Sequence, residues 1–413
     1  MSSGRHADLS RGRELALLAT LCAVQFTHVV DFMIVMPLAP QFMRLWGIDP
    51  REFGLLVSAY TFAASASGFV AVLVIDRYDR RHALLFMVSG FTVSTALCGF
   101  AQGYAALFAA RVLAGGFGGV TGALILAIVA DVVPYARRAR ANALVASAFS
   151  LAAIAGVPAG LWLAAQFNWR APFLAVASLA VFAWATAWRV LPPIAGHVEH
   201  GRSHGALARL RAVVSVSNHW HSFAFVVALM FAGFTVIPFI AAYSVANVGI
   251  REAELPILYA AGGITTLVTA QVIGRLADRF GKQRVFLWVA LASVAPILAI
   301  THMPRASLPG FMPVFVAFMV LVTGRFGPAM ALVSGSAEPR LRGSFMSLTA
   351  SIQQLGAGLA AYLAGATIGE GAGGPLTGFG AVGWIAVACT LASIALAFRI
   401  RVVDGQEPAK RPA

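Results

Sequence analysis

Residues 274–284 read Gly-Arg-Leu-Ala-Asp-Arg-Phe-Gly-Lys-Gln-Arg, and residues 76–80 read Asp-Arg-Tyr-Asp-Arg, a shorter version of the same stretch. The two aspartates, Asp278 and Asp76, lie 202 residues apart, which is close to half of the 413-residue chain. Two further matches recur at nearly the same offset: 140–142 with 342–344, and Pro37 with Pro238. A repeat of this length predicts two related halves, an arrangement that is common in membrane transporters.

Apolar runs of about twenty residues or more flank both copies and continue along the chain. Hydrophobic residues make up 59% of the sequence and charged residues 11%, whereas soluble domains have about 45–50% and 25%. This composition excludes a soluble enzyme core and intrinsic disorder, and the runs do not alternate as barrel strands do. The sequence predicts an all-α membrane protein with twelve transmembrane helices in two six-helix repeats. The expected spans are 15–39, 53–75, 83–101, 104–132, 141–166, 171–191, 222–245, 255–277, 284–302, 309–335, 344–368 and 377–399.

The distribution of positive charge predicts how these spans are oriented. With both termini in the cytoplasm, 23 of the 30 lysines and arginines lie on the cytoplasmic side, which satisfies the positive-inside rule. The net charge of +14 therefore needs no nucleic-acid partner. We expect a six-helix bundle over 1–191, a cytoplasmic linker over 192–221, and a second six-helix bundle over 222–413.

The quoted stretch at 274–284 resembles the loop signature of the major facilitator superfamily, and the copy at 76–80 is a degenerate version of it. Arg111-Val112-Leu113-Ala114-Gly115 is similar to the intramembrane arginine motif of the family, and Gly156-Val157-Pro158-Ala159-Gly160 to its antiporter motif. The chain looks closest to twelve-span drug/proton antiporters and arabinose-efflux-permease-like exporters. The resemblance implies a cytoplasmic gate in which an aspartate caps a helix and pairs with arginine. Its residues would be Asp76, Arg77, Arg80, Arg81, Gly274, Asp278, Arg279, Gly281 and Lys282.

Ionisable residues inside spans are costly and are functional candidates. Asp31 lies roughly 12 Å and Arg111 roughly 10 Å from the outer surface at 1.5 Å per residue, so the two can meet at one depth. If the pair opens during transport, loss of water and of the arginine favours a proton on Asp31, which would then carry protons. If the pair never opens, Asp31 is a fixed structural partner of Arg111.

His28 precedes Asp31 by three residues and shares its helix face, so it either relays the proton or packs as a hydrogen-bonded histidine. Arg325 lies in the middle of its span with no acidic partner in nearby spans. It either contacts an anionic group of the substrate or is satisfied by backbone carbonyls and glutamines. Gly156, Pro158 and Gly160 form either a pliable helix needed for exchange or ordinary helix packing.

The expected substrate cavity adds a few polar and aromatic side chains from several spans: Gln25, Phe32, Tyr60, Phe239, Tyr243 and Gln353. The central segment contains His197, His200, His204, His219 and His221, which we interpret as part of a solvated linker and not as a metal site. No phosphate-binding glycine loop supports ATP as the energy source. We expect no metal and no cofactor.

Together these features predict a monomeric, multi-pass transporter of a bacterial inner membrane that is not an enzyme. We expect a secondary active transporter that exports a small organic molecule (a drug, a sugar or an organic anion) in exchange for protons by alternating access. Its partners would be the substrate, protons and the lipid bilayer. The alternatives are a uniporter or importer on the same fold, and a membrane receptor or assembly partner that transports nothing.

Overall fold

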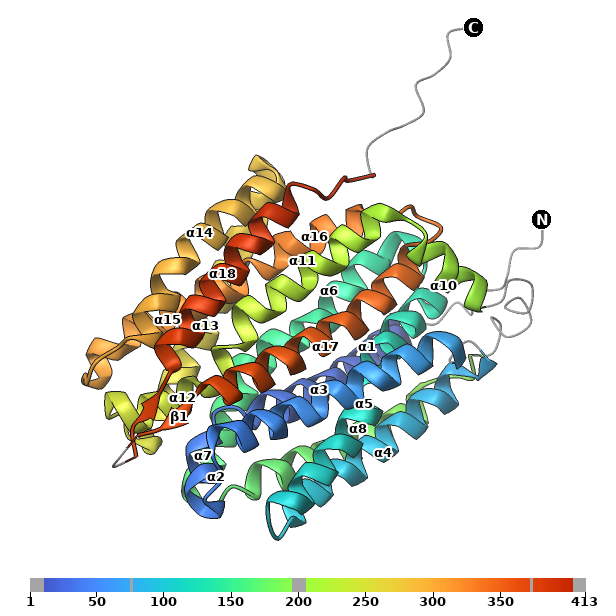
Figure 1. Ribbon diagram of the computed structural model, residues 1–413. Coiled ribbons are helices and arrows are strands. Elements are labelled where there is room, and N and C mark those ends of the chain that lie inside the picture. Colours follow the sequence, from blue (N-terminus) through green and yellow to red (C-terminus); the bar gives the residue numbers. More distant parts are fainter. Residues whose placement is uncertain (1–10, 75–76, 195–205, 372–373, 404–413) are drawn as a thin grey trace, which may run out of the picture.

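A computed structural model describes residues 11–74, 77–194, 206–371 and 374–403. Over these residues the chain is almost entirely helical (Figure 1). The helices of the first half are α1 (Arg11–Ile34), α2 (Ala39–Trp46), α3 (Pro50–Val74), α4 (Arg80–Phe100), α5 (Tyr104–Val132), α6 (Tyr135–Leu151), α7 (Val157–Gln166) and α8 (Ala171–Val190). Those of the second half are α10 (Ala206–Val214), α11 (Ser217–Phe234), α12 (Ile240–Tyr243), α13 (Leu255–Phe280), α14 (Lys282–Thr301), α15 (Leu308–Gly324), α16 (Phe326–Gly335), α17 (Arg342–Thr367) and α18 (Phe379–Ala397). Strands β1 (Gly369–Glu370) and β2 (Leu376–Thr377) form an antiparallel pair.

Shorter helical turns interrupt or extend several of these helices. A π-helical turn, Ala152–Gly156, joins α6 to α7, and a second one, Ser244–Val248, follows α12. Turns of 3-10 helix occupy Ile237–Phe239 and Glu252–Glu254. Several of the expected spans are therefore built from two or more helical pieces.

Eleven helical segments of the described residues are long and apolar enough to cross a membrane. The segment 342–367, which is α17, is not among the eleven, although it has 26 residues. Its glycines and serines, together with Gln353 and Gln354, lower its mean hydropathy, and it packs along α3 of the other half. The expected all-α fold is confirmed; the count of twelve spans stays a prediction.

The starts of α4 and α14 show the internal repeat in the structure. These helices begin directly after Asp79 and Gly281, which occupy equivalent positions in the two copies of the quoted stretch. Asp79 accepts a hydrogen bond from the His82 backbone N–H, whereas Gly281 turns the chain with a φ of 92° that disfavours other residues. Different residues therefore start equivalent helices in the two halves.

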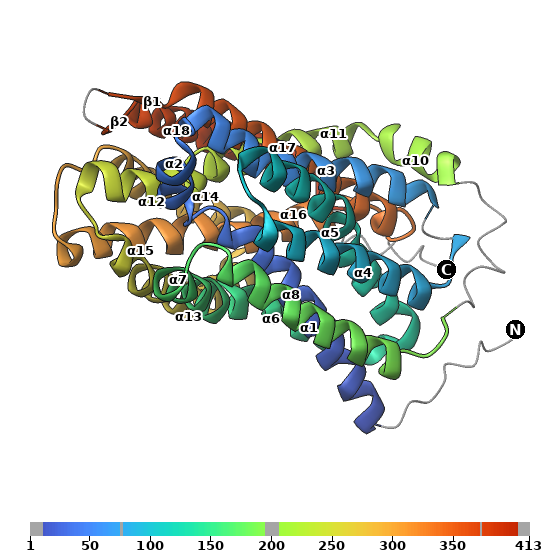
Figure 2. The ribbon, with the colours of Figure 1, turned by 90° about the horizontal axis from the view of Figure 1, so that it is seen from below.

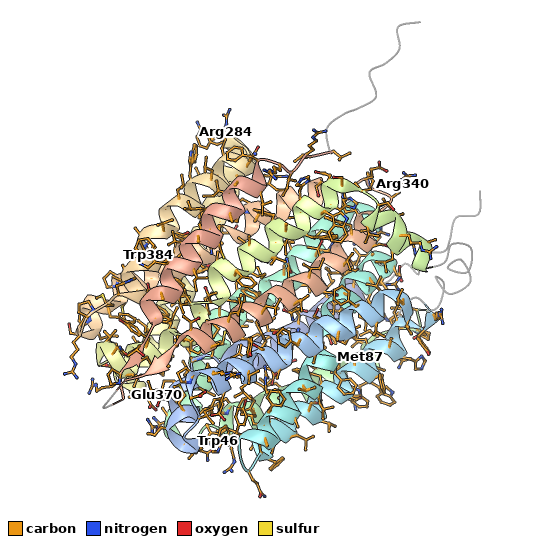
Figure 3. All side chains as sticks on the ribbon, in the orientation of Figure 1. Trp46, Met87, Arg284, Arg340, Glu370 and Trp384 are labelled. Atoms are coloured by element: carbon orange, nitrogen blue, oxygen red, sulfur yellow. The ribbon has the colours of Figure 1, made fainter. Side chains whose placement is uncertain are left out.

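The molecule has a basic end and an opposite end. The end that contains the loops around Arg80, Arg138, Arg284 and Arg340 is called the basic end. The end that contains α2 and the β1–β2 pair is called the opposite end. Figure 3 shows Arg284 and Arg340 at one extreme of the helices and Trp46 and Glu370 at the other. The positive-inside rule predicts that the basic end faces the cytoplasm, and this orientation stays a prediction.

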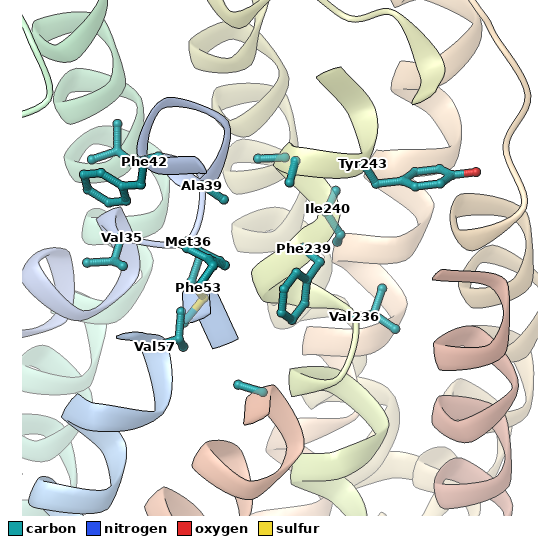
Figure 4. Close-up of a cluster of buried hydrophobic side chains, with 14 of the residues drawn as sticks. Val35, Met36, Ala39, Phe42, Phe53, Val57, Val236, Phe239, Ile240 and Tyr243 are labelled. Carbon is teal, nitrogen blue, oxygen red and sulfur yellow. The ribbon is translucent and has the colours of Figure 1, made fainter. Parts of the chain in front are cut away.

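The two halves share one apolar core at the opposite end. Phe53 of α3 contacts Phe239 of the second half with their ring centroids 5.7 Å apart (Figure 4). Arg44 of α2 also forms an ion pair with Glu252 across the halves. Toward the basic end, by contrast, the buried side chains of each half form separate clusters. The two halves are therefore closed on one another at the opposite end.

Helices α3 and α17 form a close seam between the halves. Ser58 donates a hydrogen bond to the carbonyl of Gly358 (2.8 Å), and Ser65 donates one to the carbonyl of Ser351 (2.9 Å). A Cβ on Gly54 would lie 2.8 Å from the Ala361 carbonyl, so only a glycine permits this backbone distance. The seam continues more than halfway along α3.

Candidate transport site

Asp31 and Arg111 form a buried ion pair between α1 and α5. Arg111 Nη1 donates to Asp31 Oδ2 over 2.7 Å and to the main-chain oxygen of Asp31 over 3.2 Å. The exposed fractions of the two side chains are 0% for Asp31 and 1% for Arg111. The structure thus brings together the two residues that the sequence places at one depth. A buried pair of this kind is strongly destabilised when one partner loses its charge, by about 3–5 kcal/mol.

Tyr60 of α3 and His28 of α1 extend this pair into a four-residue cluster. The Arg111 guanidinium lies over the Tyr60 ring at 4.3 Å from the ring centroid, a cation–π contact. The Tyr60 hydroxyl and His28 Nδ1 are hydrogen-bonded at 2.8 Å. Tyr60 is completely buried, so here it is a partner of Arg111 and not a wall of an open cavity.

Some hydrogen-bonding capacity in this cluster is unused. Asp31 Oδ1, Arg111 Nε and Thr95 Oγ1 are buried without a hydrogen-bond partner among the described residues. Thr95 lies on α4, and nothing in the sequence marks it as a neighbour of Asp31. Asp31 Oδ1 is the carboxylate oxygen that receives no hydrogen bond from Arg111.

Aromatic side chains connect the cluster to the second half. Phe32 packs on Tyr60 with centroids 5.4 Å apart and faces Phe234 of α11 at 6.0 Å. Phe32 is half-buried, and it is the residue directly after Asp31. The charged cluster therefore adjoins an apolar contact between the halves.

The glycines of the antiporter-like motif pack against α1 on both sides of Asp31. A Cβ on Gly156 would overlap Val30, and one on Gly160 would lie 2.7 Å from Ile34. Pro158 is the second residue of α7, just after the π-helical turn, where its missing N–H is tolerated. On another side of this turn, a Cβ on Gly263 of α13 would lie 2.7 Å from the Ala153 carbonyl. The turn is thus held between α1 of its own half and α13 of the other.

The two copies of the gate motif differ in their contacts at the basic end. Arg80 Nε pairs with Asp131 Oδ2 of α5 at 2.6 Å, and Arg81 donates to the Trp188 carbonyl at the end of α8. In the second copy Asp278 is exposed and has no ion pair among the described residues. The other members with described positions are all at the surface: Arg77, Gly274, Arg279, Gly281 and Lys282. Asp76 lies outside the described residues, so its part in the gate stays a prediction.

Arg325 points into the interior of the second half. It joins α15 to α16, and Nη1 donates to Ser293 Oγ of α14 (3.2 Å) and Thr390 Oγ1 of α18 (3.0 Å). Only 1% of the residue is exposed. Among the described residues its partners are hydroxyl groups and not the expected carbonyls or glutamines, and a substrate cannot reach the guanidinium in this conformation.

The remaining residues of the expected cavity lie in different places. Gln25 faces α5, where a Cβ on Gly122 would lie 3.8 Å from its Oε1. Phe239 belongs to the closed opposite end, and Tyr243 packs within the second half, donating to the Met303 carbonyl at 3.0 Å. Gln353 of α17 contacts Met330 Sδ at 2.9 Å. Of the expected set, Tyr60 belongs to the four-residue cluster and Phe32 contacts it.

Part of the expected linker 192–221 is helical in the described residues. It contains α10, and α11 already begins at Ser217, so His219 and His221 lie on a helix. His219 is buried, with Nδ1 2.7 Å from the Val213 carbonyl. His197, His200 and His204 lie outside the described residues. Within the described ranges no group of three histidines, cysteines or carboxylates could hold a metal ion.

Comparison with known proteins identifies the family of the chain. The family model of the Major Facilitator Superfamily matches residues 21–361 and 223–413. The uncharacterized MFS-type transporter YwfA of Bacillus subtilis (strain 168) is 26% identical over 96% of this chain and 95% of that protein. The chloramphenicol resistance protein of Streptomyces lividans is 26% identical over 94% of this chain and 96% of that protein.

A solved structure shares the fold over nearly the whole length. It is a bacterial homolog of the human lysosomal transporter Spinster, in an inward-facing and occupied conformation. The two chains superpose with a TM-score of 0.68 at 17% sequence identity, covering 95% of each. The chain belongs to the Major Facilitator Superfamily, and it is therefore a multi-pass membrane transporter and not an enzyme.

Proposed function

We propose that this secondary transporter exports a small organic molecule from a bacterial cytoplasm in exchange for protons, with Asp31 as the proton carrier. The observation that supports this most directly is the Asp31–Arg111 pair, which is buried and has one free carboxylate oxygen. A buried carboxylate with a separable cation can alternate between an ionised, paired state and a protonated, neutral one.

The surroundings of Arg111 make such an alternation feasible. When Asp31 binds a proton, the ion pair weakens, but Arg111 keeps the Tyr60 ring and the main-chain oxygen of Asp31 as partners. The guanidinium is therefore not left without a favourable contact. His28, bonded to Tyr60, is then positioned to adjust the position of the Tyr60 ring over Arg111.

The side chains next to Asp31 favour an apolar or aromatic substrate. Phe32 and Phe234 form the adjoining contact between the halves, and this contact must open for any molecule to pass. We propose that the substrate replaces these ring contacts with its own apolar surface. Arg325 stays a candidate for contact with an anionic group only in a conformation other than this one.

The antiporter-like motif can couple protonation of Asp31 to a change in how the two halves pack. Its glycines pack on α1 beside Asp31, and the neighbouring π-helical turn packs on α13 of the other half. A small movement of α1 on protonation would thus be transmitted to an interface between the halves. We propose that the gate residues at the basic end, including Asp76 and Asp278, close when the opposite end opens.

Reconstitution tests this proposal. The purified protein is placed in liposomes that contain a pH-sensitive dye, and chloramphenicol, sugars and organic acids are tested for substrate-dependent proton movement. We expect Asp31→Asn to abolish proton movement. The matched control is Glu338→Gln, which converts an exposed carboxylate at the basic end to an amide and should change nothing.

Each outcome distinguishes the proposal from its alternatives. Proton movement that persists in Asp31→Asn would contradict the assignment of Asp31. Substrate counterflow without proton movement would favour a uniporter or importer. The proposed monomeric state is tested by the mass of the detergent-solubilised protein in light scattering.

A further inference from the structure

A basic cavity lies between the start of α11 and the end of α18, far from the Asp31 cluster. Its volume is about 410 Å³, within the usual range of roughly 300–1,000 Å³ for small-molecule sites. Its lining residues are Ser217, Asn218, His221, Phe398, Arg399 and Arg401. Figure 1 shows α11 and α18 side by side, with the end of α18 at the basic end of the bundle.

Asn218 holds the arginine-containing segment in place. Its Nδ2 donates to the Arg401 carbonyl (2.8 Å) and the Ser336 carbonyl (3.1 Å), and its Oδ1 accepts the Arg401 backbone N–H (3.0 Å). The backbone after α18 is thus fixed to α11 and to the end of α16. The two arginines are presented from an ordered backbone, which reduces the entropy lost when a ligand binds.

The charge in this cavity is not compensated. Arg399 and Arg401 are exposed, and within the described residues neither side chain has an ion pair or hydrogen bond. Among the residues that the structure describes, no carboxylate lines the cavity. Arg340, at the same end of the molecule, pairs instead with Glu338 at 2.7 Å. Two free guanidinium groups with a nearby histidine suit a ligand that carries a phosphate.

Aromatic residues place this cavity at the depth of lipid headgroups. Phe398 in its wall is 62% exposed, and Trp220, next to His221, is 58% exposed. The indole Nε1 of Trp220 donates to the Val214 carbonyl at 2.8 Å, which fixes the ring at the edge of the bundle. Exposed aromatic rings beside cations mark the boundary between membrane and water.

We propose that this cavity binds the phosphate headgroup of an anionic phospholipid. Arg399 and Arg401 contact the phosphate, and the acyl chains lie along Phe398 and Trp220. Cavities of this kind, basic and between helices at the membrane surface, are suited to anionic headgroups. The bound lipid would link α11 to α18, and its site is separate from the proposed proton and substrate site.

Quenching of tryptophan fluorescence by brominated lipids tests the proposal on the full-length protein. The protein is reconstituted in phosphatidylcholine vesicles that contain a fixed fraction of brominated phosphatidylglycerol or brominated phosphatidylcholine. Subtracting the signal of Trp220→Phe isolates the Trp220 contribution from the other seven of the eight tryptophans. We expect Trp220 to be quenched more strongly by the phosphatidylglycerol at equal bromine content.

Charge-neutral variants identify the residues involved. Each arginine near an anionic lipid contributes about fivefold to the preference, so Arg399→Gln with Arg401→Gln should remove it. The matched control combines Arg189→Gln and Arg340→Gln, which removes two exposed arginines that do not line this cavity. The control should keep the preference.

Two results would overturn the proposal. One is the absence of a specific preference for phosphatidylglycerol. This means either equal quenching of Trp220 by both brominated lipids or a preference that survives in the Arg399/Arg401 variant. The other is loss of the preference on addition of inorganic phosphate, in the wild type and in the Arg189/Arg340 control alike, because the site would then take free phosphate. A preference that resists added sodium phosphate but is lost in the Arg399/Arg401 variant supports a lipid.

Discussion

At the scale of single residues, the Tyr60–His28 hydrogen bond depends on a neighbour without a side chain. A Cβ on Gly118 would lie 2.5 Å from the Tyr60 hydroxyl and 2.8 Å from the His28 ring. We predict that Gly118→Ala displaces Tyr60 from Arg111, lowers stability by about 1–3 kcal/mol through overpacking, and slows transport. Thermal unfolding in detergent and flux in liposomes measure both effects.

The control for this prediction lies on the same helix. A Cβ on Gly116 meets no atom within 4 Å, so Gly116→Ala should keep both stability and transport. If Gly118→Ala behaves in the same way as Gly116→Ala, the close fit around Tyr60 is not important for function.

Asp79 makes a pH-dependent contribution to stability. Burial alone would raise the pKa of Asp79, but hydrogen bonds from the backbone N–H groups of His82 and Ile194, together with the His82 side chain, lower the pKa overall. A carboxyl group whose pKa is lowered on folding stabilises the protein above its unfolded pKa of about 3.9. This stabilisation is lost as the pH falls through the lower folded value.

Replacement of Asp79 by asparagine tests this effect. Asparagine keeps one oxygen that can cap α4, but its NH2 group replaces the oxygen that accepts the Ile194 N–H, so the variant loses the charge and that hydrogen bond. We predict that the wild type is more stable than Asp79→Asn at neutral pH and that the difference shrinks as the pH falls below about 4. Thermal unfolding across this pH range is the measurement, and a difference that is independent of pH would contradict the prediction.

The sequence identifies the charged residues of the candidate site, but it does not identify the uncharged residues that pack against them. Asp31 and Arg111 stand out because ionisable groups inside spans are rare and costly. Thr95 and Gly118 do not stand out, since hydroxyls and glycines are common in spans and their importance depends on which helices pack together. For Arg325 the sequence shows the missing acidic partner, but not the hydroxyls of Ser293 and Thr390 that satisfy it.

At the scale of helices, the fit between the π-helical turn and α1 can be tested by a compensating pair of changes. A Cβ on Gly156 would overlap the Val30 side chain. We predict that Gly156→Ala slows transport because it pushes this turn away from α1 and alters its contact with α13. Adding Val30→Ala frees the same space and should restore a large part of the rate.

The stability of these variants separates this effect from simple misfolding. Val30→Ala alone leaves a small cavity and should cost about 1–3 kcal/mol, without a specific loss of transport per folded molecule. If the double variant is no faster than Gly156→Ala, contact between Gly156 and Val30 does not explain the role of the motif.

The sequence pattern predicts the presence of helices better than the residues at which they begin and end. Hydropathy predicts one span over 15–39, yet α1 ends at Ile34 and α2 begins at Ala39. One span is expected over 141–166, where the structure has α6, a π-helical turn and α7. Hydropathy indicates which segments lie in an apolar environment. It does not indicate where the backbone hydrogen-bond pattern changes within a continuous apolar run. The breaks occur beside Pro37 and Pro158, which are the local signals for them.

At the scale of the whole molecule, the repeat read from the sequence agrees with equivalent contacts in the two halves. Arg81 donates to the last turn of α8, and Gln283, the equivalent residue, donates to the last turn of α18 at the Ala397 carbonyl. The closed state of the opposite end could not be predicted in this way, because one sequence encodes every conformation of the transport cycle. Contacts such as those between Ser58 and Gly358 belong to the arrangement described here.

The ion pair between Arg44 and Glu252 should influence how often the opposite end opens. It joins the two halves beside their shared core, and 68% of the Arg44 side chain and 23% of the Glu252 side chain are exposed. An exposed pair contributes up to about 1 kcal/mol, so its loss should increase opening by at most about fivefold. A cysteine at Val57, which is 3% exposed, would report opening through its reaction with a membrane-impermeant thiol reagent.

The closed end also permits a test by charge exchange. We predict that Arg44→Glu speeds modification of the Val57→Cys reporter, and that combining it with Glu252→Arg restores slow modification because the attraction is re-formed with opposite sign. Arg251→Glu serves as the control, since Arg251 pairs with Glu254 within one half and does not join the halves. Unchanged modification in Arg44→Glu, or the same increase in Arg251→Glu, would show that the pair does not hold the halves together. Helices α3 and α17 lie side by side (Figure 2), and their seam begins at the end where this pair lies, so a positive result would mean that closure there combines a weak surface ion pair with close backbone packing.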